Sequence, residues 1–167
     1  MLPEVIRSCN AAGLPLRFFV QVTTREMAAR LGKGFDDLRA TDNVELQFGD
    51  MSADDYMARL RMSDTVLIPY SPQHYAVKAS GVFAEAVAMS KATVVSPGGW
   101  MAGELHAGRG AGTVFKSFDA GAMVAAIGEA VERFSTLDAD AQDRASAWRE
   151  LHSTARYLDR LLAELPA

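Results

Sequence analysis

One short segment has residue types and a spacing that suit the binding of an anion. Ser80 and Gly81 come directly before an apolar helical pattern, and Glu85 lies one turn inside it. The first backbone N–H groups of a helix have no partner within the helix, and the positive end of the helix dipole attracts negative charge. A carboxylate one turn away can accept hydrogen bonds from two ribose hydroxyls. These groups together predict a site for a nucleotide diphosphate.

The same residues also have a purely structural interpretation. Ser80 and Gly81 can simply cap the helix, and a first-turn glutamate gains about 0.3–1 kcal/mol from the helix dipole. Charge-assisted hydrogen bonds to a ligand would contribute about 1.5–3 kcal/mol each. Glu85 lies between Phe83 and Val87 in an otherwise apolar helix, where a charge without a partner is costly. We therefore favour the binding role.

The elements that must position this segment alternate along the chain. Apolar runs bounded by Gly, Pro, Asp or Asn predict strands, and amphipathic patterns between them predict helices. Ser52, with Asp55 three residues later, is typical of a helix start. The predicted strands are 16–22, 44–48, 65–69, 93–96 and 113–115, and the predicted helices between them are 3–12, 25–39, 52–61, 81–90 and 101–106.

This alternation predicts an α/β fold with a doubly wound, Rossmann-like parallel sheet of about five strands flanked by helices. Strands of nearly continuous Val, Leu and Ile are covered on both faces, and crossovers through helices make their neighbours parallel. Ligands of such sheets bind beyond the carboxyl ends of the strands. The loops after Val22, Phe48, Pro69 and Ser96 are therefore expected to carry function.

The last third of the chain is predicted to be helical. Asp119 caps a helix that runs to Phe134, and a second, long helix covers 138–162. The long helix has an apolar stripe at three-four spacing. Docking on its own domain is the usual fate of such a stripe and is favoured over binding a partner. The stripe consists of Trp148, Leu151, Ala155, Leu158 and Leu162.

Composition narrows the function classes. The 167 residues are 49% hydrophobic and 23% charged, which predicts one globular domain with a substantial core. A net charge of -4 without a dense basic run argues against nonspecific nucleic-acid binding. Cys9 is the only cysteine, so neither an intrachain disulfide nor a cysteine metal cluster can form. No apolar run reaches the about 18 residues of a membrane span, and no secretory signal opens the chain. We expect a cytoplasmic protein, with peripheral membrane association left open.

Several motifs resemble one enzyme family in their order and spacing. They are Asn43–Met51 (NVELQFGDM), Asp54–Tyr56 (DDY), Ser63–Tyr70 (SDTVLIPY), Ser80–Ser96 and Gly98–Leu105 (GGWMAGEL). No single motif is decisive. In this order they resemble the nucleotide-sugar-binding half of the group 1, GT-B fold glycosyltransferases, over about Pro3 to Phe134. The resemblance implies a nucleotide-sugar-binding domain over 1–135 and a helical extension over 136–167.

The resemblance also implies a role for each matching residue. Gly49, Asp50 and Met51 match the loop that reads the nucleotide base, while Ser80, Gly81 and Val82 face the diphosphate. Glu85 matches the glutamate that holds the ribose hydroxyls. Lys78 is placed to neutralise a phosphate, and the donor-sugar side is assigned to Gly98, Gly99 and Glu104. Ordinary turns and a solvated lysine are the alternative interpretations. No catalytic residue is assigned, and neither a metal nor another cofactor is expected.

The sequence departs from the family in two respects. The family carries a glutamate eight residues before the ribose glutamate, and that position here is Val77. The family's first strand, which is central in its sheet, and the acceptor-binding domain before it have no match in this chain. We therefore expect part of a larger or two-chain enzyme that is inactive alone, and a sheet that rearranges or self-associates.

Two functions follow as hypotheses. The first is the donor-binding part of a glycosyltransferase, of hexosyltransferase type and retaining by resemblance, that moves a sugar from a nucleotide-diphosphate sugar to an unknown acceptor. The second is a non-catalytic nucleotide-binding or interaction module. The expected partners are the nucleotide sugar and an acceptor domain or partner chain.

Overall fold

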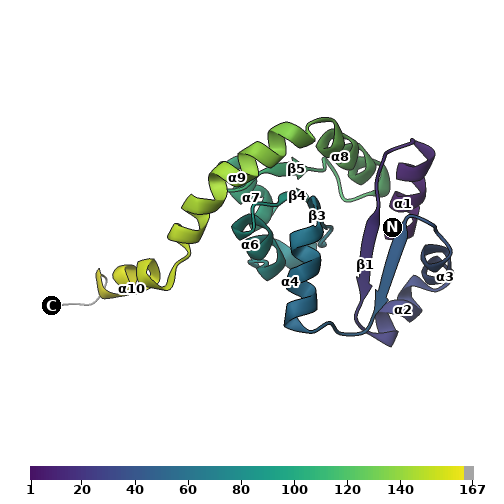
Figure 1. The fold of residues 1–167 in the computed structure, drawn as a ribbon, viewed down its shortest axis with the longest axis horizontal. Helices are drawn as coiled ribbons and strands as arrows, with labels where there is room; N and C mark the ends of the chain where they lie inside the picture. The colour runs from purple at the N-terminus through teal and green to yellow at the C-terminus, as the bar shows by residue number, and fades with distance from the viewer. Residues whose placement is uncertain (164–167) are drawn as a thin grey trace.

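The computed structural model describes residues 1–163, apart from the side chains of residues 31, 35 and 160. Helices and parallel strands alternate along this part of the chain, which confirms the α/β class (Figure 1). The strands are β1 (Phe18–Val22), β2 (Val44–Phe48), β3 (Thr65–Ile68), β4 (Ala92–Val95) and β5 (Gly112–Val114). The helices are α1 (Leu2–Ala11), α2 (Arg25–Leu31), α3 (Lys33–Arg39), α4 (Ala53–Met62), α5 (Pro72–Tyr75), α6 (Gly81–Ala88), α7 (Trp100–His106), α8 (Ala120–Glu132), α9 (Phe134–Leu151) and α10 (Thr154–Ala163).

The five strands form two parallel sheets instead of the single predicted sheet. β1 pairs with β2, and β3, β4 and β5 form a second sheet in that order. Within residues 1–163 no strand lies between β1 and β3, and no ladder joins them. β1 and β3 therefore each pair with a strand on one side only.

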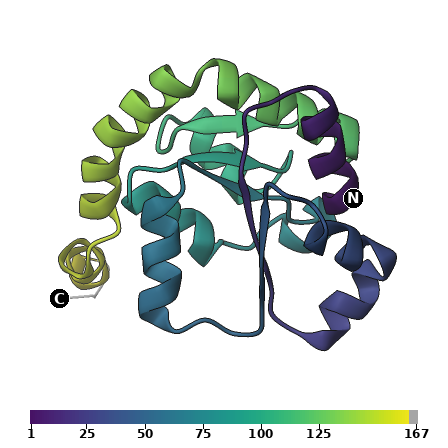
Figure 2. The same ribbon diagram turned by 45° about the vertical axis from the view of Figure 1, so that its right-hand side comes forward.

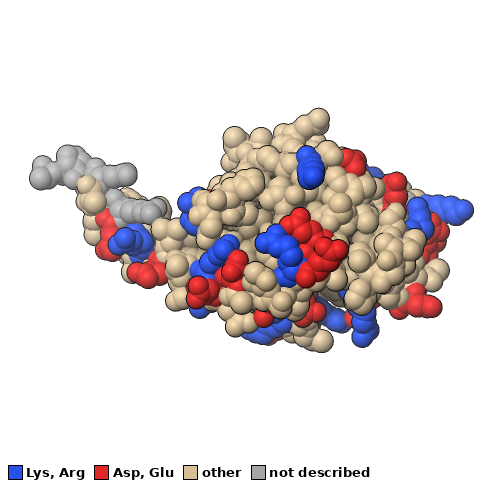
Figure 3. Space-filling model, turned by 90° about the horizontal axis from the view of Figure 1, so that it is seen from above, with Lys and Arg blue, Asp and Glu red and all other residues tan. Residues whose placement is uncertain are grey.

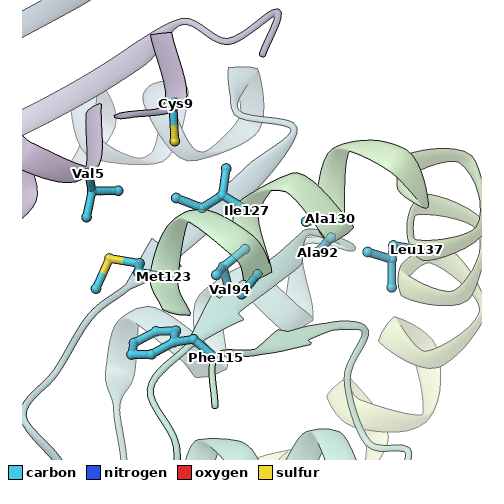
Figure 4. Close-up of a cluster of buried hydrophobic side chains, with 10 residues drawn as sticks. Val5, Cys9, Ala92, Val94, Phe115, Met123, Ile127, Ala130 and Leu137 are labelled. Atoms are coloured by element: carbon cyan, nitrogen blue, oxygen red, sulfur yellow. The ribbon is translucent and has the colours of Figure 1, made fainter. Parts of the chain in front are cut away.

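Helix α1 connects the two sheets through its buried face. Val5 and Cys9 pack with α8 and β4 in one core cluster, shown in Figure 4. Ile6, on the same helix, packs with Val20 and Val22 of β1. Figure 2 shows α1 beside α8 on one side of the three-stranded sheet. Burial of α1 against both sheets therefore holds them in one body.

The opposite faces of the sheets carry other helices. Phe83 of α6, Met101 of α7 and Trp148 of α9 pack with Ile68 and Val95 in a second buried cluster. Over the two-stranded sheet, the Arg59 guanidinium of α4 lies 4.7 Å from the centre of the Phe19 ring and forms an ion pair with Glu45. The three-stranded sheet thus has helices on each face, while α4 reaches the two-stranded sheet through the Arg59 side chain.

Local sequence signals explain several helix ends. The Ser52 side chain accepts a hydrogen bond from the Asp55 N–H, and Asp119 accepts one from Ala122, which confirms both predicted caps. The predicted helix over 25–39 is wrong as one element. It is divided at Gly32, whose φ of +52 is a conformation that glycine adopts without strain.

The predicted long helix over 138–162 is also wrong as one element, because the chain turns at His152 and Ser153 between α9 and α10. Of the predicted stripe only Trp148, which is 3% exposed, is buried, so the docking interpretation is confirmed for this residue. Leu137 and Ala141 of α9, which were not in the stripe, are buried as well. Leu158 and Leu162 of α10 are 50% and 65% exposed and do not dock. Figure 1 shows α10 extending away from the rest of the molecule.

The surface shows no concentration of one charge on the face seen from above, where Lys and Arg are interspersed with Asp and Glu (Figure 3). Among residues 1–163, no helix combines the length and the apolar character that crossing a membrane requires. Cys9 is buried in the core, and this burial raises the pKa of its thiol.

Candidate functional site

A pocket of about 430 Å³ lies where β3 ends and α6 begins. The loop after β3, the short helix α5 and the first turns of α4 and α6 surround it. It contains four of the residues predicted from sequence, together with three tyrosines and an alanine that were not predicted as site residues. The lining residues are Tyr56, Tyr70, Tyr75, Ala79, Ser80, Gly81, Val82 and Glu85.

The N-terminus of α6 has the open backbone groups that the sequence predicted. Ser80 is the N-cap, is 4% exposed, and its hydroxyl accepts a hydrogen bond from the Phe83 N–H at 3.2 Å. The Ser80 carbonyl accepts the Ala84 N–H at 3.0 Å. The N–H groups of Gly81 and Val82 have no acceptor within the described part of the chain, and both residues line the pocket. Two donors at the positive end of a helix are therefore available to a ligand.

Glu85 lies on the exposed side of α6, at the edge of the pocket. The sequence argument that its charge is buried among Phe83 and Val87 is therefore wrong, because those two side chains point into the core while Glu85 does not. The Tyr56 hydroxyl donates a hydrogen bond to Glu85 Oε2 at 2.6 Å. This bond fixes the carboxylate and leaves its other oxygen without a partner in the described residues.

Aromatic rings form the other wall of the pocket. Tyr70 and Tyr75 have ring centres 4.2 Å apart at an interplanar angle of 31°. Burial raises the pKa of Tyr70, and the hydrogen bond with Ser80 partly offsets this. The signal that could have revealed these residues is their place after a predicted strand, since Tyr70 lies two residues after the end of β3 and Tyr75 ends the short helix α5. Tyr56 was noted only as the end of the motif Asp54–Tyr56, without a role in the site.

Lys78 and Val77 are exposed in the loop between α5 and α6. The Lys78 ammonium lies 5.9 Å from the centre of the Tyr75 ring, so it sits beside the pocket without lining it. Val77, which occupies the position of the family's glutamate, is 93% exposed. The structure thus places a cation, and no carboxylate, at this side of the pocket.

The predicted base-binding loop lies apart from the pocket lining. Gly49, Asp50 and Met51 connect β2 to α4, and Gly49 has a φ of +91. The Gly49 N–H donates to the Val22 carbonyl at 3.0 Å, and its own carbonyl accepts from Gln21 Nε2 at 3.1 Å. These bonds give the loop a fixed conformation at the carboxyl end of β2.

Gly98, Gly99 and Glu104 lie outside the pocket lining. A Cβ at Gly99 would lie 2.8 Å from the Tyr75 carbonyl oxygen, so glycine permits the start of α7 to approach the pocket wall. Gly98 precedes it in the same turn, with a φ of +68. Glu104 is buried and forms a two-pronged ion pair with Arg109, one N–O distance being 2.9 Å. Glu104 therefore anchors α7 to the loop before β5 and does not line the pocket.

The Tyr56–Glu85 contact predicts a dependence of stability on alkaline pH. Burial, and then the hydrogen bond and negative charge of Glu85, raise the pKa of Tyr56 above its ordinary value of 10. The unfolded chain thus loses this proton at lower pH than the folded chain, so the free energy of unfolding falls as pH rises above 10. Tyr56→Phe should reduce that slope, measured by urea unfolding at several pH values. If the unfolding free energy fell equally steeply with pH in both proteins, the raised pKa of Tyr56 would not be the cause.

No group of three or more His, Cys, Asp or Glu side chains able to hold a metal ion occurs in residues 1–163. The comparisons with known proteins add no family: no family model matches the chain, and no curated protein matches it in sequence.

Proposed function

We propose that this chain is the donor-binding part of a glycosyltransferase and binds a nucleotide-diphosphate sugar at the pocket beside α6. In this proposal the two parallel sheets are the two parts of an interrupted, doubly wound Rossmann-like sheet. The observation that carries it is the convergence of two open helix amides and a positioned carboxylate on one pocket. The resemblance of Asn43–Leu105 to GT-B enzymes agrees with this arrangement.

The pocket residues suit the parts of such a ligand. The Gly81 and Val82 amides face the diphosphate, and Lys78 adds a positive charge beside them. Glu85 accepts the ribose hydroxyls, and Tyr56 holds its carboxylate in place. The Tyr70–Tyr75 pair offers apolar ring surface to the sugar or the base. During transfer of the sugar the leaving diphosphate gains negative charge, which amides and a cation stabilise.

Gly81→Asp tests the anion site without disturbing the fold. A Cβ at Gly81 meets no atom within 4 Å, and an aspartate in the first turn adds about 0.3–1 kcal/mol of helix stability. Its carboxylate would repel a diphosphate, since like charges ~4 Å apart interact by about 4 kcal/mol at an effective dielectric of 20. We expect binding of UDP, GDP or ADP, measured by calorimetric titration, to weaken at least about a hundredfold.

Two control variants are needed. One separates the effect of the added charge from that of the added Cβ, and the other separates the diphosphate contact from the ribose contact. Gly81→Ala adds the Cβ without the charge and should retain binding. Glu85→Gln should weaken nucleoside diphosphates by about tenfold or more but leave binding of inorganic pyrophosphate unchanged, because only the ribose contact is lost. Failure of the native chain to bind any of these diphosphates, or equal binding by Gly81→Asp, would overturn the proposal.

A non-catalytic nucleotide-binding module is the second candidate, and Val77 favours it. Its exposed apolar side chain stands where the resemblance expects a glutamate near the sugar. The two candidates differ in turnover: an enzyme part should hydrolyse or transfer the sugar of a bound nucleotide sugar once its acceptor half is supplied. Binding without turnover under those conditions would identify the module.

A further inference from the structure

A second pocket, of about 100 Å³, lies between α9 and the loop that joins α7 to β5. The described residues that line it differ from all those that line the candidate nucleotide site. None of these lining residues has a side chain with a carboxylate, hydroxyl or amide oxygen. They are Gly108, Arg109, Arg144, Ala147, Trp148 and Leu151. The polar side-chain groups of this pocket are therefore all hydrogen-bond donors.

Arg109 is oriented by a buried carboxylate. Its Nε and Nη2 atoms donate to the two oxygens of Glu104, which is 7% exposed. Its Nη1 atom has no acceptor in residues 1–163. A guanidinium is a rigid, planar fork of donors, so two bonds to one carboxylate fix the direction of the remaining N–H groups. Arg109 therefore presents an unused donor in a set direction.

Arg144 is oriented from two sides. Its Nη1 atom donates to the Gly110 carbonyl at 2.6 Å, and Nη2 donates to Asp140 Oδ2 at 2.8 Å. The first contact ties this guanidinium to the loop that carries Arg109. Its Nε atom finds no acceptor in the part of the chain that the structure describes. Two positioned guanidinium groups, each with an unused donor, thus line one small pocket.

The Trp148 indole adds a third donor. Its Nε1–H has no acceptor among the described residues, although the side chain is only 3% exposed. In residues 1–163, every fully buried polar side-chain atom has a hydrogen-bond partner, so this N–H must lie in the small accessible part of the indole. Because Trp148 lines the pocket, the indole N–H is available there to a ligand.

Size and charge define the ligand that suits these donors. The pocket has room for about three waters, since each occupies about 30 Å³ in the liquid, and therefore for a carboxylate of a few carbons. Ala147 and Leu151 provide apolar surface for its carbon chain. Each arginine is already paired with one acid, so a single negative charge is easier to accept than the double charge of a phosphate.

We propose that this pocket binds a small aliphatic monocarboxylate, whose carboxylate is held by the two arginines and the Trp148 indole. Guanidinium groups match a carboxylate in geometry, and charge-assisted hydrogen bonds are about twice as strong as neutral ones. Such a ligand has few atoms, so its dissociation constant is expected on the order of 1 mM. This site is distinct from the proposed nucleotide site.

Titration of the full chain with sodium propionate, followed by ¹H–¹⁵N NMR, tests the proposal. The chain has two tryptophans, so the spectrum contains two indole N–H signals, which Trp100→Phe assigns. The Trp148 signal should shift to saturation, while the Trp100 signal, from a residue outside the lining, should change little. Sodium chloride and sodium phosphate at matched ionic strength are the comparison titrations. Phosphate should bind at least about tenfold more weakly than propionate.

Two substitutions with opposite expected effects separate binding from damage to the fold. Arg144→Gln removes one guanidinium and should weaken propionate binding at least about tenfold. Asp140→Asn removes the carboxylate that competes for Arg144, so propionate should bind about threefold or more tightly. The matched controls are Arg133→Gln and Glu129→Gln, which make the same charge changes in an ion pair outside the pocket lining and should leave the affinity unchanged.

Three results would each overturn the proposal. The first is an unshifted Trp148 signal at propionate concentrations up to about 50 mM, well above the expected dissociation constant. The second is an equal response to sodium chloride or equal affinity for phosphate. The third is weaker binding by Asp140→Asn, which would mean that the ion pair matters only for the fold. None of these readouts depends on nucleotide binding.

Discussion

Gly112→Ala is expected to remove about 3–6 kcal/mol of folding stability, a large part of the about 5–15 kcal/mol that a folded domain possesses. Gly112 opens β5 opposite Thr93 and has a φ of +155, which is strained for any residue with a Cβ. A Cβ would also lie within 2.9 Å of the Thr93 amide nitrogen and overlap its carbonyl oxygen. Thr93 is fully buried in the central strand β4, so its backbone cannot move aside.

The measurement is urea unfolding followed by circular dichroism, with Gly128→Ala as the matched control. Gly128 lies inside α8, and a Cβ there meets no atom within 4 Å. Alanine should therefore stabilise that helix by about 0.4–1 kcal/mol. If Gly112→Ala lost less than about 1 kcal/mol, the close packing of β4 against β5 described here would be incorrect.

The strands could be predicted from sequence because each is a short apolar run with clear boundary residues. The predicted 44–48 coincides with β2, and the others differ from the observed strands by one or two residues. Helix boundaries were predictable where a side chain caps them, as at Ser52 and Asp119. The breaks at Gly32 and at His152–Ser153 were missed, because a helical periodicity can continue through one turn of irregular backbone.

The division into two sheets could not be read from local patterns. Strand pairing joins residues that are distant in sequence, so the pattern within β1 or β3 does not show whether these two strands pair with each other. The resemblance to a family whose central strand is absent predicted rearrangement or self-association. The structure shows two sheets whose strands β1 and β3 each contribute a side chain, Phe18 and Leu67, to one core cluster; rearrangement or self-association stays a prediction.

Only the part of the candidate site that lies within one helix could be predicted from the sequence. Ser80, Gly81, Val82 and Glu85 are consecutive on one helix, so their proximity follows from local geometry. The three tyrosines come from α4, the β3 exit and α5, and only the tertiary fold brings them together. Glu85 was chosen for its place one turn inside the helix and by the resemblance; the added argument from an unpartnered charge in an apolar helix failed, since Glu85 is exposed and accepts a hydrogen bond from Tyr56.

Trp148→Ala is expected to cost about 3–5 kcal/mol and to weaken the candidate site as well. The indole is 3% exposed and packs edge-on against Phe83 of α6, with ring centres 5.9 Å apart and an interplanar angle of 80°. It also contacts Trp100 at the start of α7, at 6.1 Å. Phe83 lies between Gly81 and Glu85 on α6, so the cavity left by the indole would loosen the helix that carries both groups.

Tyr157→Ala is the matched control for this loss. Tyr157 is an aromatic residue of α10, the next helix, and is 65% exposed, so its removal should change stability by less than about 0.5 kcal/mol. Thermal and urea unfolding would measure both variants, and calorimetric titration of UDP would follow the site. A loss below about 1.5 kcal/mol for Trp148→Ala would mean that α9 does not support α6. A large loss with unchanged nucleotide affinity would mean that the first turn of α6 is held by its own cap, Ser80, and by the pocket tyrosines.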